Sequence, residues 1–223
     1  MSGTTLLTGG SKYSNLIKRK LKQDGDCIVL LSDPGTGDSA VSVTDTAPEK
    51  QDTRDLSIVW NKRSPLSARN AVLSALNSYN TVEKAVLIYQ PGDYSKTFHE
   101  TSSAVYDLQI DRWVKGYGYL LKEIIQLFIK QQNGQLSFIL NTDGMKVMTP
   151  LESAIFSYLK SLLQNLSILY QNEPFRIFCF ESDTARQDEF INYFIKTTAE
   201  QKYTAGKIQR FADKKSLFDF SKN

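Results

Sequence analysis

The sequence has few of the residues on which several classes of protein depend. It contains two cysteines, Cys27 and Cys179, and one histidine, His99. Both cysteines stand inside apolar runs, which argues against a disulfide framework and indicates buried thiols in a reducing compartment. A single histidine in a polar segment, with no cysteine pair near it, predicts no metal site. We therefore expect a cytoplasmic protein that is not held together by disulfides or metal.

An excess of one charge and long apolar runs are also missing. The 27 Lys and Arg residues against 24 Asp and Glu leave a net charge of +3, which predicts neither a nucleic-acid nor a membrane partner. No apolar run reaches the roughly 20 residues that a membrane span needs, and no targeting segment is visible at the N-terminus. The 223 residues, 41% of them hydrophobic, suffice for one core, so we expect a single domain over residues 1–223.

What the sequence does contain is a regular alternation of two patterns. Short apolar runs, typical of strands covered on both faces, are expected at 4–8, 27–31, 56–60, 86–89, 136–140, 175–180 and, at an edge, 207–211. Apolar residues at helical spacing predict helices at 14–21, 65–79, 112–130, 150–169 and 187–197. Residues 91–104 are polar and turn-rich, and 34–55 predict a flexible loop.

Strands separated by helical segments specify parallel pairing, because a parallel connection needs a crossover that covers the sheet. We therefore predict the α/β class: a single Rossmann-like, doubly wound domain. Its sheet is expected to be mostly parallel, with six or seven strands and helices on both faces.

The order of these elements resembles the short-chain dehydrogenase/reductase family over nearly the whole chain. The first strand runs into Thr8-Gly9-Gly10 and a helix, as in that family. Residues 114–120 (Val-Lys-Gly-Tyr-Gly-Tyr-Leu) are similar to its V-N-x-x-G-x-F helix, 136–144 to its strand ending in N-x-S-S-x-x-G, and 205–208 to its closing T-G-x-x-I/V strand. The resemblance implies an NAD(P)-dependent oxidoreductase, provided that the family's functional residues are present.

The cofactor loop of the family, Thr-Gly-x-x-x-Gly-x-Gly, is only half present. Thr8 and Gly9 match, but the next two glycine positions hold Tyr13 and Asn15. Those glycines allow a tight turn and a close approach of the pyrophosphate to the backbone. A tyrosine ring is expected to occupy that space, unless the loop has been redrawn.

Three further residues are candidates for cofactor contacts. Lys12 is placed to attract an anion, and Asp33 stands where a carboxylate accepts the ribose hydroxyls, although Ser-Asp-Pro-Gly is equally an ordinary turn. Of the family's N-N-A-G segment only Gly92 is kept. With Thr8 and Gly9, these residues are the candidate cofactor site. We expect no cofactor, with NAD or NADP as the alternative.

The catalytic tetrad of the family is absent by position. Its Tyr-x-x-x-Lys pair needs spacing four on one helix face, whereas Tyr158 and Lys160 are two residues apart. The serine position falls on Thr142 or Asp143, and the helix asparagine is replaced by Lys115. Tyr158 is left as a weak candidate, and Asp143 is either a strand-end carboxylate or a turn residue.

The leading hypothesis is a non-catalytic protein with a short-chain dehydrogenase scaffold that acts in binding or assembly. A ligand or a protein partner is expected at the cleft formed by the loops after Leu7, Leu31, Tyr89 and Leu140. The alternatives are a divergent oxidoreductase and a cofactor-sensing regulator without turnover. Because residues 151–169 are apolar on more than one face, a homodimer through helices 112–130 and 151–169 is also predicted.

Overall fold

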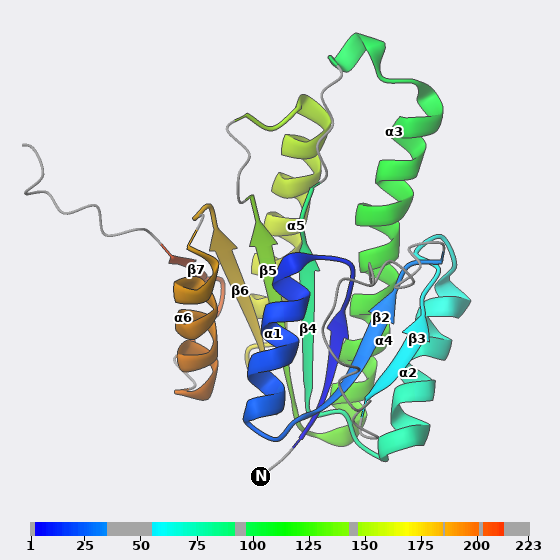
Figure 1. Cartoon of the computed structure of the whole chain (residues 1–223). Helices are drawn as coiled ribbons and strands as arrows, with labels where there is room; N and C mark the ends of the chain where they lie inside the picture. Colours follow the sequence, from blue (N-terminus) through cyan, green and yellow to red (C-terminus); the bar gives the residue numbers. More distant parts are fainter. Residues whose placement is uncertain are drawn as a thin grey trace, which may run out of the picture.

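The fold is built around one parallel sheet of seven strands (Figure 1). The structure is a computed structural model, and it describes residues 3–34, 55–91, 97–142, 147–184, 186–200 and 203–211. The strands lie in the order β3-β2-β1-β4-β5-β6-β7. Their bounds are Thr4–Thr8 for β1, Cys27–Ser32 for β2, Leu56–Val59 for β3, Lys84–Tyr89 for β4, Gly134–Asn141 for β5, Phe175–Ser182 for β6 and Ile208–Phe211 for β7. All six pairings are parallel, so the predicted class is confirmed and the sheet is wholly rather than mostly parallel.

Helices cover both faces of this sheet, as expected for a doubly wound domain (Figure 1). The helices are α1 (Lys12–Gln23), α2 (Pro65–Tyr79), α3 (Ser103–Gln109), α4 (Gly116–Gln131), α5 (Pro150–Leu169) and α6 (Gln187–Ala199). Side chains of α1 and α6 share one core, and those of α2, α4 and α5 share the other. Successive strand residues serve opposite cores: Leu6 packs toward α4 and Leu7 toward α1. This explains why the strands are continuous apolar runs.

Local capping fixes where two of the predicted helices begin. The Ser64 hydroxyl accepts from the backbone N–H of Ser67, and Pro65 stands at the first helical position. At α5, Thr149 and Glu152 form a reciprocal capping box around Pro150. Both helices begin where the sequence predicts. Proline is favoured at the first helical position because the N–H that it lacks would have no partner inside the helix.

The helix expected at 112–130 begins earlier than predicted, and the reading of 91–104 as turn-rich is wrong at its end. Helix α3 starts at Ser103, and a π-helical segment, Ile110–Lys115, joins it to α4. The Ser102 hydroxyl caps α3, but most of its residues are exposed, so no apolar stripe marked it in the sequence. The predicted flexible loop at 34–55 lies outside the described residues from 35 to 54.

Most apolar side chains of α5 are buried in the core of the chain itself, which weakens the sequence argument for a second chain packed on this helix. Ile155, Phe156, Leu159 and Leu163 are buried, whereas the outer face carries serines and, as exposed apolar side chains, Tyr158, Ile168 and Leu169. A hydrophobic excess on α5 therefore does not by itself require a second chain. The homodimer stays a prediction.

Candidate functional site

The carboxyl edge of the sheet gathers several of the residues singled out from the sequence. Thr8 ends β1, Asp33 follows β2, Thr142 follows β5, and Lys115 ends the π-helical segment. Gly92 and Asp143 lie outside the described residues, as does the side chain of Lys12. In open α/β sheets this edge is where ligands bind. Tyr158 is not part of the group, because it is on the exposed side of α5.

The turn after β1 is packed tightly against β2. The Gly9 N–H donates to the Leu31 carbonyl at 2.7 Å, and a Cβ on Gly9 would lie 3.1 Å from that same oxygen. The Thr8 hydroxyl accepts from the Ile88 N–H at 2.9 Å, which ties the turn to β4. A side chain at position 9 would require the neighbouring atoms of β2 to move by a few tenths of an ångström, which favours glycine at this close approach of backbone to backbone.

Tyr13, at the second glycine position of the family's loop, is a core residue. Its side chain is fully buried, and its ring lies 5.8 Å from the ring of Phe190 on α6. The Tyr13 hydroxyl donates to the Thr184 carbonyl at 3.4 Å. The ring thus joins the start of α1 to the segment that follows β6, across the same edge of the sheet.

Asp33 has two cationic partners from other elements. Lys62, which follows β3, has its Nζ 2.9 Å from Oδ1 of Asp33, and Nη2 of Arg112 lies 2.6 Å from Oδ2. Arg112 belongs to the π-helical segment, so this carboxylate ties the ends of β2 and β3 to the start of α4. Sequence reasoning found Asp33 but missed both cations, because their positions relative to it depend on the strand order.

Lys62 is enclosed by aromatic rings. Its Nζ lies 5.3 Å from the ring centre of Trp60, 4.9 Å from that of Trp113 and 5.6 Å from that of Tyr117, and the residue is 9% exposed. Such faces attract an ammonium group. Desolvation by burial nevertheless outweighs the Asp33 charge and lowers the pKa of Lys62 to about 8.

Lys115 has a partner on its own helical segment. Its Nζ lies 2.8 Å from Oδ1 of Asp111, and Nε of Arg63 lies 3.0 Å from Oδ2 of the same carboxylate. The hydrogen bond from Lys115 to Asp111 raises the pKa of Lys115 and favours its charged form. Lys115 therefore stands in a surface ion-pair network at this edge.

Helix α5 does present a pair at spacing four, but it is Phe156 and Lys160. The Lys160 Nζ lies 5.7 Å from the Phe156 ring centre, so the two side chains share a face. Lys160 is paired with Glu181 of β6 at 2.8 Å, and the Thr142 hydroxyl donates to the Ser182 carbonyl at 3.4 Å. The sequence analysis considered only tyrosine in front of a lysine and therefore missed this pair. An aromatic residue four positions before Lys160 was the feature that could have revealed it.

The described residues contain neither a cluster of metal ligands nor a membrane-spanning helix. No group of three or more His, Cys, Asp or Glu residues there is placed to hold a metal ion. No helix in the same part of the chain has the length and apolarity to cross a membrane.

Solved structures share this fold at low sequence identity. The 3-ketoacyl-(acyl-carrier-protein) reductase from Brucella melitensis, complexed with NADH, superimposes with a TM-score of 0.74 at 13% identity, over 93% of this chain and 96% of that one. The L-sorbose reductase from Gluconobacter frateurii, complexed with NADPH and L-sorbose, gives 0.74 at 15% identity over 94% and 95%. A short chain dehydrogenase from Bacillus anthracis gives 0.77 at 11% identity over 94% of each chain.

Sequence comparisons found no counterpart. No protein-family model matches the chain, and no curated protein matches it. The likeness is therefore one of fold.

Proposed function

We propose that this chain, whose fold is that of the short-chain dehydrogenases/reductases, is a non-catalytic protein that acts in binding or assembly. The observation that carries the proposal is the state of Asp33. Both of its carboxylate oxygens are engaged by cations of the chain itself, Lys62 and Arg112. A carboxylate that holds ribose hydroxyls must instead be open to accept them.

The residues at this edge do not fit a dinucleotide as the family holds it. Lys62 is buried against three aromatic rings next to Asp33, so its departure would leave the carboxylate with one cation and expose apolar surface. The Gly9 N–H is already bonded to the Leu31 carbonyl and is not available to a pyrophosphate. These contacts support a closed carboxyl edge.

The residues around α5 support the absence of proton-transfer chemistry. Phe156 has no hydroxyl to transfer a proton, and the lysine four residues later is neutralised by Glu181. Only a short segment separates β6 from α6, so little chain is available there to exclude water from a reaction.

The proposed role also includes a homodimer through α4 and α5, with a partner or small ligand at the carboxyl edge. The exposed side of α5 carries Ser157 and Ser161 together with the exposed apolar side chains of Tyr158, Ile168 and Leu169, which supports contact with a second copy. A two-fold interface of this kind would use the same surface on both copies.

Calorimetric titration of the purified chain with NAD⁺, NADH, NADP⁺ and NADPH, beside thermal shift at millimolar ligand, tests the proposal. We expect no heat of binding and no shift with any of the four. The NADP forms are included because an arginine near this carboxylate can hold the 2′-phosphate that only NADP carries, and the Arg112 side chain is 36% exposed beside Asp33. A dissociation constant below about 100 µM, which corresponds to a binding free energy of about 5.5 kcal/mol, would show that the carboxyl edge is open to a dinucleotide and would overturn the proposal.

An Asp33→Asn variant makes the result specific to this edge. Binding by the natural chain that is lost in Asp33→Asn, under conditions where the variant shows a cooperative unfolding transition, would place a dinucleotide at the family's site and contradict the proposal. Turnover assays with carbonyl substrates would then separate an oxidoreductase from a cofactor-sensing regulator.

A further inference from the structure

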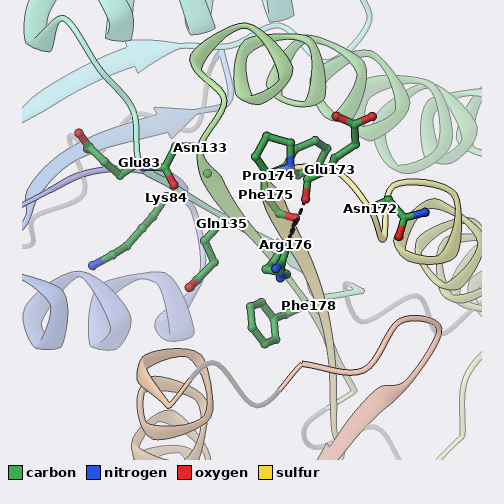
Figure 2. A pocket seen from close by; sticks show the side chains of 11 residues that line it. Glu83, Lys84, Asn133, Gln135, Asn172, Glu173, Pro174, Phe175, Arg176 and Phe178 are labelled. Carbon is green, nitrogen blue, oxygen red and sulfur yellow. Dashed lines mark hydrogen bonds between the residues drawn. The ribbon is translucent and has the colours of Figure 1, made fainter.

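Two hollows adjoin at the opposite, amino edge of the sheet. The larger, of about 550 Å³, is lined by the starts of β4, β5 and β6 and by the turns that precede them (Figure 2). The smaller, of about 240 Å³, lies between the last turns of α1 and α6. Lys84 and Gln135 line both, so the two hollows are continuous along these side chains.

Lys84, Gln135 and Arg176 form one row across three neighbouring strands. In the parallel register Lys84 is the partner of Gln135, and Gln135 is the partner of Arg176. Such partners lie about 4.8 Å apart and project from the same face of a sheet. Two residues further along, Val86 and Phe178 are on that face and belong to the core under α1 and α6. The Gln135 and Arg176 side chains are therefore neighbours on the face that α1 and α6 cover, and Figure 2 shows them side by side.

The guanidinium of Arg176 is held in place within the chain. Its Nη1 donates to the carbonyls of Glu173 and Phe175, each at 3.0 Å, and its central carbon lies 5.6 Å from the ring centre of Tyr203. The Tyr203 hydroxyl in turn donates to the Ser167 carbonyl at 2.9 Å. Because these contacts exist without a ligand, less conformational entropy is lost when one binds.

The charge of Arg176 remains available to an anion. Within the described part of the chain it forms no ion pair, and its Nε and Nη2 donate to no other residue. These two groups present parallel N–H bonds that match the two oxygens of a carboxylate. The neighbouring Gln135 side chain also has no hydrogen bond among the described residues, so its amide can donate to the same anion.

The other charges at this edge limit the anion to a single negative charge. Lys84, on the far side of Gln135, is already paired with Asp26 at 2.7 Å. The carboxylates of Asp24, Glu83 and Glu173 line the two hollows. Their repulsion disfavours a dianion such as phosphate and is smaller for a monocarboxylate.

The smaller hollow provides the apolar half of a site. Apolar side chains from both helices and from β4 line it: Leu21, Val86, Phe194 and Ile195. A cavity of about 150 Å³ with walls of this kind is large enough for benzene. A hollow of about 240 Å³ therefore has room for one aromatic ring.

We propose that this edge binds a small monocarboxylic acid with one aromatic ring. The ligand carboxylate contacts Arg176 and Gln135, and the ring lies between α1 and α6. The site is separate from the carboxyl edge, so it stands whether or not the proposed function does.

Calorimetric titration of the full chain with benzoate, phenylacetate and 3-phenylpropionate tests the proposal. Acetate, which lacks the ring, and benzamide, which lacks the charge, are the control ligands. We expect at least one of the three aromatic acids to bind with a dissociation constant below about 1 mM, and both controls to bind at least tenfold more weakly. Absence of binding by all three acids, or equal binding by either control, would overturn the proposal.

A pair of arginine variants locates the carboxylate. Arg176→Gln should weaken binding of the aromatic acid at least tenfold. Arg210→Gln, which replaces an arginine paired with Glu181 at the other end of the sheet, should bind as the natural chain does. Unchanged affinity in Arg176→Gln would contradict the site.

A pair of tryptophan variants locates the ring and does not depend on the folding of Arg176→Gln. Ala199, the last residue of α6, lines the smaller hollow and is exposed, so Ala199→Trp places a large side chain there without disturbing the core. It should weaken binding at least tenfold. Asn192→Trp, at an exposed position of the same helix outside the hollow, should have no effect. Unchanged affinity in Ala199→Trp would overturn the proposal.

Discussion

The main chain of Lys62 lies directly against Gly116, the first residue of α4. A side-chain carbon on Gly116 would be 2.7 Å from Cβ and 2.8 Å from the carbonyl oxygen of Lys62. Such distances do not occur between real Cβ atoms and their neighbours. The absence of a side chain at position 116 therefore allows Lys62 to reach both its aromatic surroundings and Asp33.

The first prediction concerns this contact. Gly116→Ala should destabilise the chain by about 1–3 kcal/mol, because the added methyl must push backbone away. Gly118→Ala is the matched control on the same helix, since nothing lies within 4 Å of its added Cβ. It should stabilise the chain by about 0.5–1 kcal/mol through helix propensity. Urea unfolding measures both, and equal effects of the two substitutions would contradict the contact.

The second prediction is a pH dependence that belongs to Lys62. Its pKa is about 8 in the folded chain and 10.5 as a free side chain. Below pH 8 the lysine is charged in both states, and the cost of burying the charge is present in full. Between the two pKa values only the unfolded chain keeps the proton, so the free energy of unfolding rises with pH.

Lys62→Met removes that titration and gives the comparison. The natural chain should gain about 3 kcal/mol of stability relative to Lys62→Met between pH 7.5 and 10.5, since one pKa unit is about 1.4 kcal/mol. Urea unfolding of both proteins across this range measures the difference. Parallel pH profiles would show that the burial of the ammonium has no cost.

The third prediction is energetic coupling between Asp33 and Lys62. Asp33→Asn should destabilise the chain by about 3 kcal/mol, because it leaves a buried ammonium beside a neutral amide. The double variant Asp33→Asn with Lys62→Met should be more stable than the sum of the single effects predicts, by about 1–3 kcal/mol. Additive effects in the double-mutant cycle would mean that the pair, despite its 2.9 Å distance, contributes no interaction energy.

The fourth prediction is the oligomeric state. Size-exclusion chromatography with light scattering should give twice the chain mass of 25.2 kDa at micromolar concentration. Ser157→Arg, on the exposed side of α5, should give a monomer, because a long charged side chain cannot be accommodated between closely packed helices. Ser74→Arg, on the exposed side of α2, is the control and should remain dimeric. A monomeric natural chain would rule out the interface.

Much of the fold was predictable because it depends on local patterns. The strand runs, Ser64 with Pro65, and Pro150 after Thr149 each specify an element through burial or capping within a few residues. The start at Ser103 was not predictable in this way. Helix α3 is mostly exposed, so its sequence carries no apolar periodicity. The π-helical segment then rotates the buried face of α4 relative to that of α3, which interrupts the helical spacing.

The candidate site was predictable only in part. Asp33 was recognisable because it directly follows a strand, and the departures at Tyr13 and Lys115 could be read against the family's spacing. The direction of the Tyr13 ring, into the core rather than toward the turn, depends on α6, which begins at Gln187. No local pattern contains that information.

The sequence by itself determined the α/β class, the parallel sheet and the places of Thr8, Asp33 and Thr142 at the ends of strands, because hydrophobic period and turn chemistry act over short distances. Only the tertiary structure decided that Lys62 and Arg112 meet on Asp33 and that Phe156 faces Lys160. These contacts join residues from different strands and helices, or depend on which helix face meets the sheet. Packing and charge in three dimensions select such partners, and a linear sequence does not state them.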